Sequence, residues 1–161
     1  MHHARMPLIT EACRDNAEVL ALSVLRFVAA GYMTSDVACW DAAHDGAERL
    51  LGPIDGPLVA AMTGVMRAIR VERQGDWRFM PATCCRVTED ERSLVALVAA
   101  ARDGATSAQA LRDAAAVAIG RTAAPRLVTA AREAGDVLNR IEPPLQPGAG
   151  DPHMPGRAPL H

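Results

Sequence analysis

The sequence contains no lysine, and its seventeen strongly basic side chains are all arginine. A phosphate-binding loop of the Gly-Lys-Ser/Thr kind, a Schiff-base enzyme and a lysine general base each need a primary amine, which a guanidinium cannot replace. These three mechanisms are therefore excluded. The net charge of −2 and the pI of about 6.2 give no reason to expect nucleic acid or an anionic membrane as a partner of the whole chain.

Aromatic residues are also scarce, since two Phe, two Trp and one Tyr are present among 161 residues. Alanine supplies about a fifth of the chain, and half of all residues are hydrophobic. Small side chains allow helices to approach closely, and alanine has the strongest helix propensity. A chain of this length and composition predicts one helical domain with a continuous core.

The chain shows no pattern of a signal peptide, because acidic and arginine residues precede its first apolar run. That run, from Val19 to Met33, is shorter than the roughly 20 apolar residues that a membrane-spanning helix needs. We therefore expect a cytoplasmic protein without a membrane partner. In that compartment the four cysteines are expected to be reduced thiols.

Apolar residues recur at helical spacing along most of the sequence. This periodicity predicts an all-α, single-domain bundle of five to six helices over residues 8–142. The first predicted helix, 9–32, is apolar almost all round and is the candidate for a central helix. Thr88 and Glu91 have the spacing of a capping box, which predicts a helix start there. The other predicted helices begin near residues 36, 57, 106 and 125.

Two segments lack this periodicity. Residues 74–87 contain Gly75 and Pro81 and predict an irregular connection inside the domain. Residues 143–161 contain six prolines and three glycines with few apolar residues to bury. This composition predicts a disordered tail.

Cysteine and histidine offer one possible metal or redox site, made from Cys39, His44, Cys84 and Cys85. These residue types suit zinc or iron. However, Cys39 and His44 are five residues apart, which separates them by about 140° around a helix. Cys84 and Cys85 are adjacent and lack the two-residue spacer of a zinc knuckle. No cofactor is therefore the first prediction, with zinc or iron as the alternative, and a redox-active thiol at Cys84 or Cys85 is a second function to test.

The one histidine away from the chain ends, His44, falls on an apolar stripe with Val37, Trp40 and Ala47. The spacing predicts that His44 is packed against the bundle rather than exposed. The sequence also lacks a Gly-x-Ser-x-Gly elbow and any supported Ser/His/Asp set. Together these observations favour a protein without enzymatic activity.

The run from Val87 to Val98 resembles the first helix of LuxR-type helix-turn-helix domains, and this resemblance implies a DNA-binding regulator. Residues 88–141 contain seven acidic and seven arginine residues, so they lack the positive charge that phosphate contacts require. The Ala-rich helix that follows offers few side chains for reading bases. Nucleic acid is therefore not the expected partner, and this function is a further alternative.

Local positive charge is concentrated in residues 67–86, where arginine alternates with two aromatic residues. Arginine and aromatic side chains are enriched in protein interfaces, and the guanidinium also suits carboxylate ligands. We therefore predict a helical interaction or regulatory module that self-associates or binds a protein partner. The predicted partner-binding residues are Arg67, Arg70, Arg73, Trp77, Arg78, Phe79 and Arg86.

Overall fold

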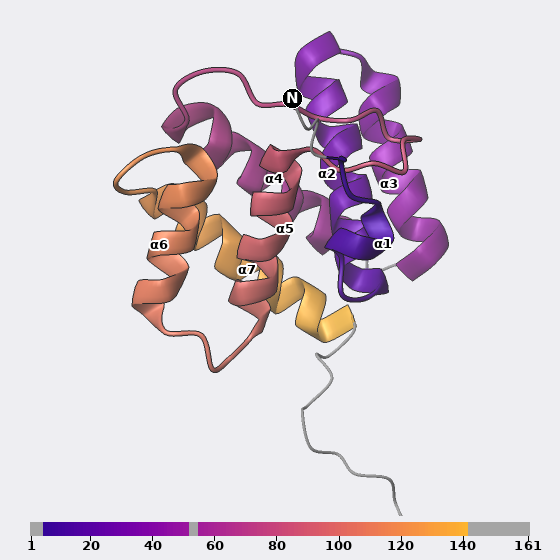
Figure 1. Ribbon diagram of the computed structural model, residues 1–161. Coiled ribbons are helices and arrows are strands. Elements are labelled where there is room, and N and C mark those ends of the chain that lie inside the picture. The colour runs from indigo at the N-terminus through magenta and orange to yellow at the C-terminus, as the bar shows by residue number, and fades with distance from the viewer. Residues whose placement is uncertain (1–4, 52–54, 142–161) are drawn as a thin grey trace, which may run out of the picture.

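The structure, a computed structural model, describes residues 5–51 and 55–141, and all regular elements in this part are helices (Figure 1). The prediction of an all-α domain is confirmed. The predicted disordered tail, residues 143–161, lies outside the described residues. The helices of the described part are α1 (Ile9–Ala12), α2 (Asn16–Thr34), α3 (Val37–Leu51), α4 (Asp55–Glu72), α5 (Glu89–Arg102), α6 (Ala108–Ile119) and α7 (Pro125–Ile141).

The centre of the bundle is α2, which packs against α3, α4, α5 and α7. By length and composition alone, α2 could cross a membrane, and it is the one helix of the described part for which this holds. Most of that stretch, 61%, is buried inside the bundle. Burial of this kind is typical of the core helix of a globular protein.

The predicted first helix, 9–32, is wrong at its start, because the structure divides it into α1 and α2. The backbone is extended at Cys13, and Asp15 begins a new helix as its N-cap. The Asp15 Oδ1 atom accepts a hydrogen bond from the Glu18 amide at 3.0 Å. An aspartate that satisfies a free amide in this way stabilises a helix start rather than a continuous helix.

The predicted buried stripe of α3 is wrong in part: Ala47 is buried and Trp40 packs against the core as predicted, but His44 is exposed and Val37 is 69% exposed. Among the α3 side chains that the structure describes, residues 37–49, the fully buried ones are Ala43 and Ala47, while Trp40 is half-buried against the core. Alanine occurs on several faces of this helix, so helical periodicity did not distinguish the two neighbouring stripes. The structure selects the stripe with the smaller side chains, which lets α3 lie close to α2.

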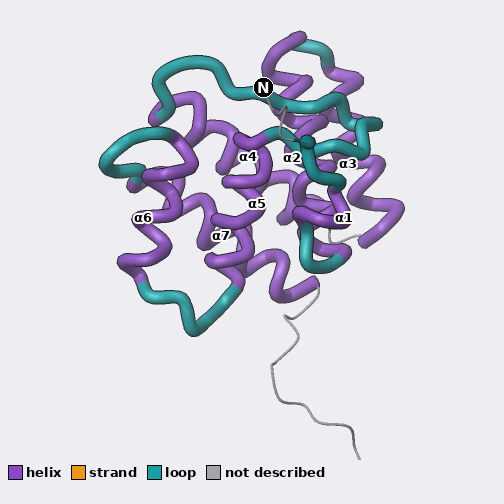
Figure 2. The backbone as a smooth tube through the Cα atoms, in the orientation of Figure 1, coloured by secondary structure: helices purple, strands orange, loops and turns teal. Residues whose placement is uncertain are grey.

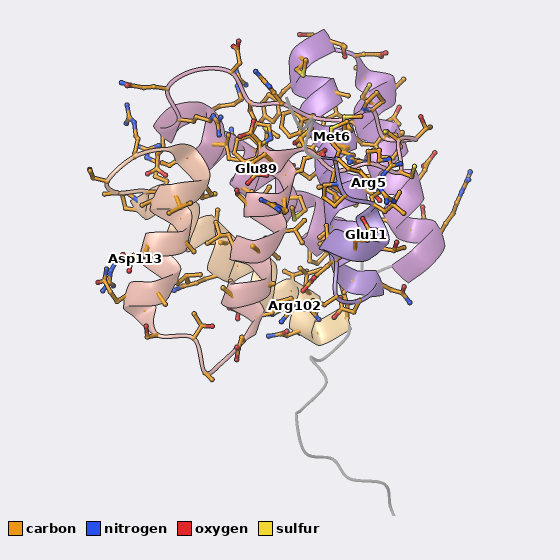
Figure 3. The ribbon with its side chains drawn as sticks, viewed as in Figure 1. Arg5, Met6, Glu11, Glu89, Arg102 and Asp113 are labelled. Atoms are coloured by element: carbon orange, nitrogen blue, oxygen red, sulfur yellow. The ribbon has the colours of Figure 1, made fainter. Side chains whose placement is uncertain are left out.

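Two ion pairs link α2 to α5 in the interior. The Arg26 Nε atom lies 2.7 Å from Glu91 Oε1, and both side chains are almost completely buried. Toward the other end of α5, Arg102 lies 3.2 Å from Glu18 and 2.8 Å from Asp15. Figure 3 shows Arg102 and Glu89 at opposite ends of α5. The start of α5, at Glu91, pairs with the later part of α2, and the end of α5, at Arg102, pairs with the start of α2, so the two helices run antiparallel.

The connection between α4 and α5 is irregular, as predicted, and passes over one end of the bundle (Figure 2). The Arg26 guanidinium donates to the carbonyl oxygens of Cys84 and Arg86, both at 2.6 Å. The predicted capping box is confirmed, since Thr88 and Glu91 accept each other's backbone N–H. Glu91 also accepts the Met80 amide. One buried ion pair therefore holds both the start of α5 and the connection before it.

Candidate binding pocket

A pocket of about 490 Å³ lies where the connection passes over the ends of α2 and α4. Both helices reach the pocket with their C-terminal turns. Most of its wall is apolar, and its charged residues are two arginines and one aspartate. The lining residues are Ala29, Tyr32, Met33, Met66, Ile69, Arg70, Arg73, Gly75, Asp76, Trp77 and Phe79.

Arg70 stacks on an aromatic ring beside the pocket. Its Cζ atom lies 4.6 Å from the centroid of the Tyr32 ring, which itself packs edge-on against Trp40 with 5.1 Å between ring centroids. Arg70 is exposed, and no carboxylate of residues 5–51 or 55–141 forms an ion pair with it. The stacking therefore positions a guanidinium whose N–H groups have no acidic partner within the described chain.

Arg73 stacks in the same way on Trp77, with 4.9 Å between its Cζ atom and the ring centroid. Its other contacts are structural, because it pairs with Asp90 at 3.0 Å and donates to the Ala118 carbonyl at 3.2 Å. Trp77 packs against Phe79 with 5.8 Å between ring centroids. Arg73 thereby anchors the aromatic wall of the pocket to α5 and α6.

Two buried donors at this wall lack an acceptor, namely Arg73 Nε and Trp77 Nε1. A buried donor without a partner costs about 1–3 kcal/mol, and functional sites are one place where such a cost is retained. Both atoms are covered by neighbouring side chains. The described chain therefore leaves hydrogen-bonding capacity at this wall unused.

The structure brings together four of the seven residues predicted for partner binding, which are Arg70, Arg73, Trp77 and Phe79. It places the other three elsewhere. Arg67 lines a separate groove between α4 and α7. Arg78 has an exposed side chain, and its backbone amide donates to Asp90 at 2.9 Å. The Arg86 guanidinium donates to the Met6 carbonyl at 2.9 Å, so it binds the N-terminal segment.

Sequence reasoning missed the side of the pocket that α2 supplies with Ala29, Tyr32 and Met33. Tyr32 and Met33 are about forty residues before the arginine segment, and no short motif joins the two regions. No sequence signal marks this side of the pocket, because Met33 belongs to the predicted apolar run and its 75% exposure at the end of α2 is visible only in the structure. That position depends on where α2 ends, at Ser35 in the left-handed region with φ of 54°.

The predicted metal ligands are not gathered into a metal site in the described part of the chain, where no group of three or more His, Cys, Asp or Glu residues could hold an ion. Cys39 contacts Thr34 at 3.9 Å, and the Cys84 sulfur accepts the Arg86 amide at 3.4 Å. Cys85 is exposed. Thiol sensing by Cys84 and Cys85 stays a prediction, which thiol reactivity measured against pH would test.

The fourth cysteine, Cys13, lies in a second small core cluster between α2 and α5. Burial, followed by the nearby carboxylate of Glu18, raises the pKa of this thiol from 9.0 to about 11. Its thiol is therefore neutral over the physiological pH range. Cys13 is a core residue and not a nucleophile.

No family model, curated protein or solved structure matches this chain. In the part of the chain that the structure describes, the fold and the pocket define an all-α bundle with an arginine-rich and aromatic recess at the end where α2 and α4 terminate. DNA binding by α5 and α6 stays a prediction.

Proposed function

We propose that this protein is a non-enzymatic helical interaction module that self-associates, and that the pocket and its rim form the contact surface. The observation that carries the proposal is Arg70, an exposed guanidinium held on Tyr32 without an acidic partner in the described residues. Arginine beside aromatic rings is the composition of the central contacts of protein interfaces.

Exposed apolar side chains at the same end of the bundle support this surface. Met33 and Val37 are 75% and 69% exposed and flank the turn between α2 and α3. Val71 is 59% exposed in the last turn of α4, next to Arg70. Scattered apolar residues are ordinary on protein surfaces, but several around a recess favour a contact surface. The absence of readable catalytic motifs in the sequence supports a non-enzymatic role.

The oligomeric state tests this proposal. We expect light scattering after size exclusion to show a dimer whose fraction rises with protein concentration. The double variant Arg70→Glu plus Trp77→Ala is expected to be monomeric, because it reverses the exposed charge and removes the aromatic wall. The matched control is Arg67→Glu, which makes the same charge change on the same helix outside the pocket.

Two results would contradict the proposal. One is a wild-type protein that stays monomeric at the highest concentration reached. The other is a dimer that persists unchanged in the double variant while circular dichroism shows that the variant is folded.

A further inference from the structure

The pocket has the dimensions and walls of a small-molecule site. Its volume of about 490 Å³ falls within the roughly 300–1,000 Å³ typical of ligand pockets. Met33, Met66 and Phe79 contribute much of the apolar wall. Methionine is flexible and polarizable, so such a wall can adapt to an aliphatic or aromatic body.

The charged residues that line the pocket indicate the charge of the ligand that would bind there. Arg70 and Arg73 both line it, and Asp76 is its one acidic lining residue. Arg73 pairs with Asp90, whereas no ion pair among the described residues joins Arg70 to Asp76 or to another carboxylate, so the N–H groups of Arg70 remain available to a ligand. A guanidinium that stacks through its face keeps the N–H groups at its edge for a carboxylate, which it can bind through two parallel hydrogen bonds.

A cationic ligand fits poorly, although aromatic rings often bind cations. The ring faces of Tyr32 and Trp77 are already occupied by the two arginine guanidinium groups, at 4.6 and 4.9 Å. A second cation would meet both the occupied rings and the positive charge of Arg70. The recess therefore favours an anion.

The helix ends at the pocket limit how much negative charge a bound ligand can carry. Helices α2 and α4 both end at the pocket, and helix C-termini carry partial negative charge. The two arginines are matched in number by Asp76 and by Asp90, the partner of Arg73, so the pocket carries no large net positive charge and its preference for an anion rests on the position of Arg70. A single carboxylate suits such a site better than a phosphate dianion, which would need several cationic groups or helix N-termini.

From these observations we infer that the pocket binds a small organic monocarboxylate with an apolar body, whose carboxylate pairs with Arg70 and whose body lies against Met33, Met66 and Phe79. The pocket is complete within one chain. The inference therefore does not need the proposed self-association, although both use Arg70 and the same pocket, so octanoate is expected to compete with dimer formation if both hold.

Calorimetric titration of the full chain with octanoate, octanamide and inorganic phosphate tests the inference, with tryptophan fluorescence as a second readout. Trp77 lines the pocket, and Trp40 contacts the Tyr32 ring under Arg70. We expect saturable binding of octanoate with one site per chain. Octanamide, which has the same chain without the charge, is expected to bind at least about tenfold more weakly, equal to about 1.4 kcal/mol.

Arg70→Gln is expected to weaken octanoate binding by about tenfold or more, whereas Arg67→Gln leaves it unchanged. Met33→Glu provides an independent variant, because it places a carboxylate at the pocket and should also weaken octanoate binding. Met33→Gln is its neutral control. Both positions are exposed in the structure, so these variants are expected to fold.

The inference is overturned if octanoate does not bind, if octanamide binds equally well, if phosphate binds more tightly, or if Arg70→Gln binds octanoate like the wild type. Light scattering on the same samples separates this outcome from the proposed function. A monomer that binds octanoate through Arg70 refutes self-association alone. A dimer that depends on Arg70 but binds no octanoate refutes the ligand alone.

Discussion

Arg26 and Arg70 lie on neighbouring helices but occupy opposite environments. The chain surrounds Arg26 with acceptors, since both oxygens of Glu91 and the carbonyls of Cys84 and Arg86 receive its N–H groups. Arg70 is positioned just as definitely, on Tyr32, but the described chain offers it no carboxylate. An arginine whose acceptors are all internal organises the fold. An arginine that is held in place without an acceptor is available to bind a partner protein or a ligand.

At the other end of α5, Arg102 is surrounded by acceptors of the chain, as Arg26 is. It is almost fully buried and contacts Asp15, Glu18 and Asn139. Glu18 also forms an ion pair with Arg14, at 2.7 Å. Paired charges of this kind add little net stability relative to an apolar core, but removing one partner is costly because the other stays buried.

The largest effect is expected from breaking the Arg26 site. Glu91→Ala leaves the Arg26 charge buried without a counterion and removes half of the capping box, so the free energy of unfolding should fall by about 3–5 kcal/mol. Urea unfolding measures this. The control Glu89→Ala removes a 76% exposed carboxylate from the same helical turn and should cost at most about 1 kcal/mol. Equal losses in the two variants would show that the buried pair has no special role.

A smaller loss, roughly 2–3 kcal/mol, is expected for Arg102→Met. Methionine fills part of the buried volume, and Arg14 still pairs with Glu18 after the substitution. Arg92→Met is the matched control, because the Arg92 pair with Glu89 is exposed, and it should change the unfolding free energy by less than about 0.5 kcal/mol. If the free energy of unfolding fell no more for Arg102→Met than for the control, Arg102 would not be an arginine that stabilises the fold.

A pH-dependent effect of about 1–2 kcal/mol is expected from Cys13, just before the start of α2. The Cys13 pKa is raised from 9.0 to about 11 in the fold, so the neutral thiol is favoured there. Its contribution is complete below pH 9 and declines as the pH rises toward 11. Between pH 8 and 10.5 the wild type should therefore lose more stability than Cys13→Ala, as measured by urea unfolding. Parallel pH profiles for the two proteins would contradict the raised pKa.

The smallest effect on stability is expected at Arg70. Because this guanidinium is exposed and unpaired in the described chain, Arg70→Gln should change the unfolding free energy by less than about 0.5 kcal/mol. If the free energy of unfolding fell by about 2 kcal/mol or more, Arg70 would stabilise the fold as Arg26 does, and the contrast between the two arginines would be wrong. Thermal unfolding followed by circular dichroism decides between the two.

Much of the fold follows from local sequence, but the polar interior does not. The capping box at Thr88 and Glu91 was predicted because both residues lie within one turn. That Glu91 also binds Arg26, 65 positions away, has no local signal. The exposure of His44 was mispredicted because an Ala-rich helix has more than one face that can be buried.

The sequence by itself determined the helical class, the irregular connection and the concentration of arginine and aromatic residues in 67–86. These properties depend on propensity, spacing and capping, which act over a few residues. Only the tertiary structure decided which arginines became structural and which remained available. An arginine's role depends on the acceptors that distant segments bring to it, and α2 supplies both Glu18, which binds Arg102, and Tyr32, which holds Arg70 without neutralising it.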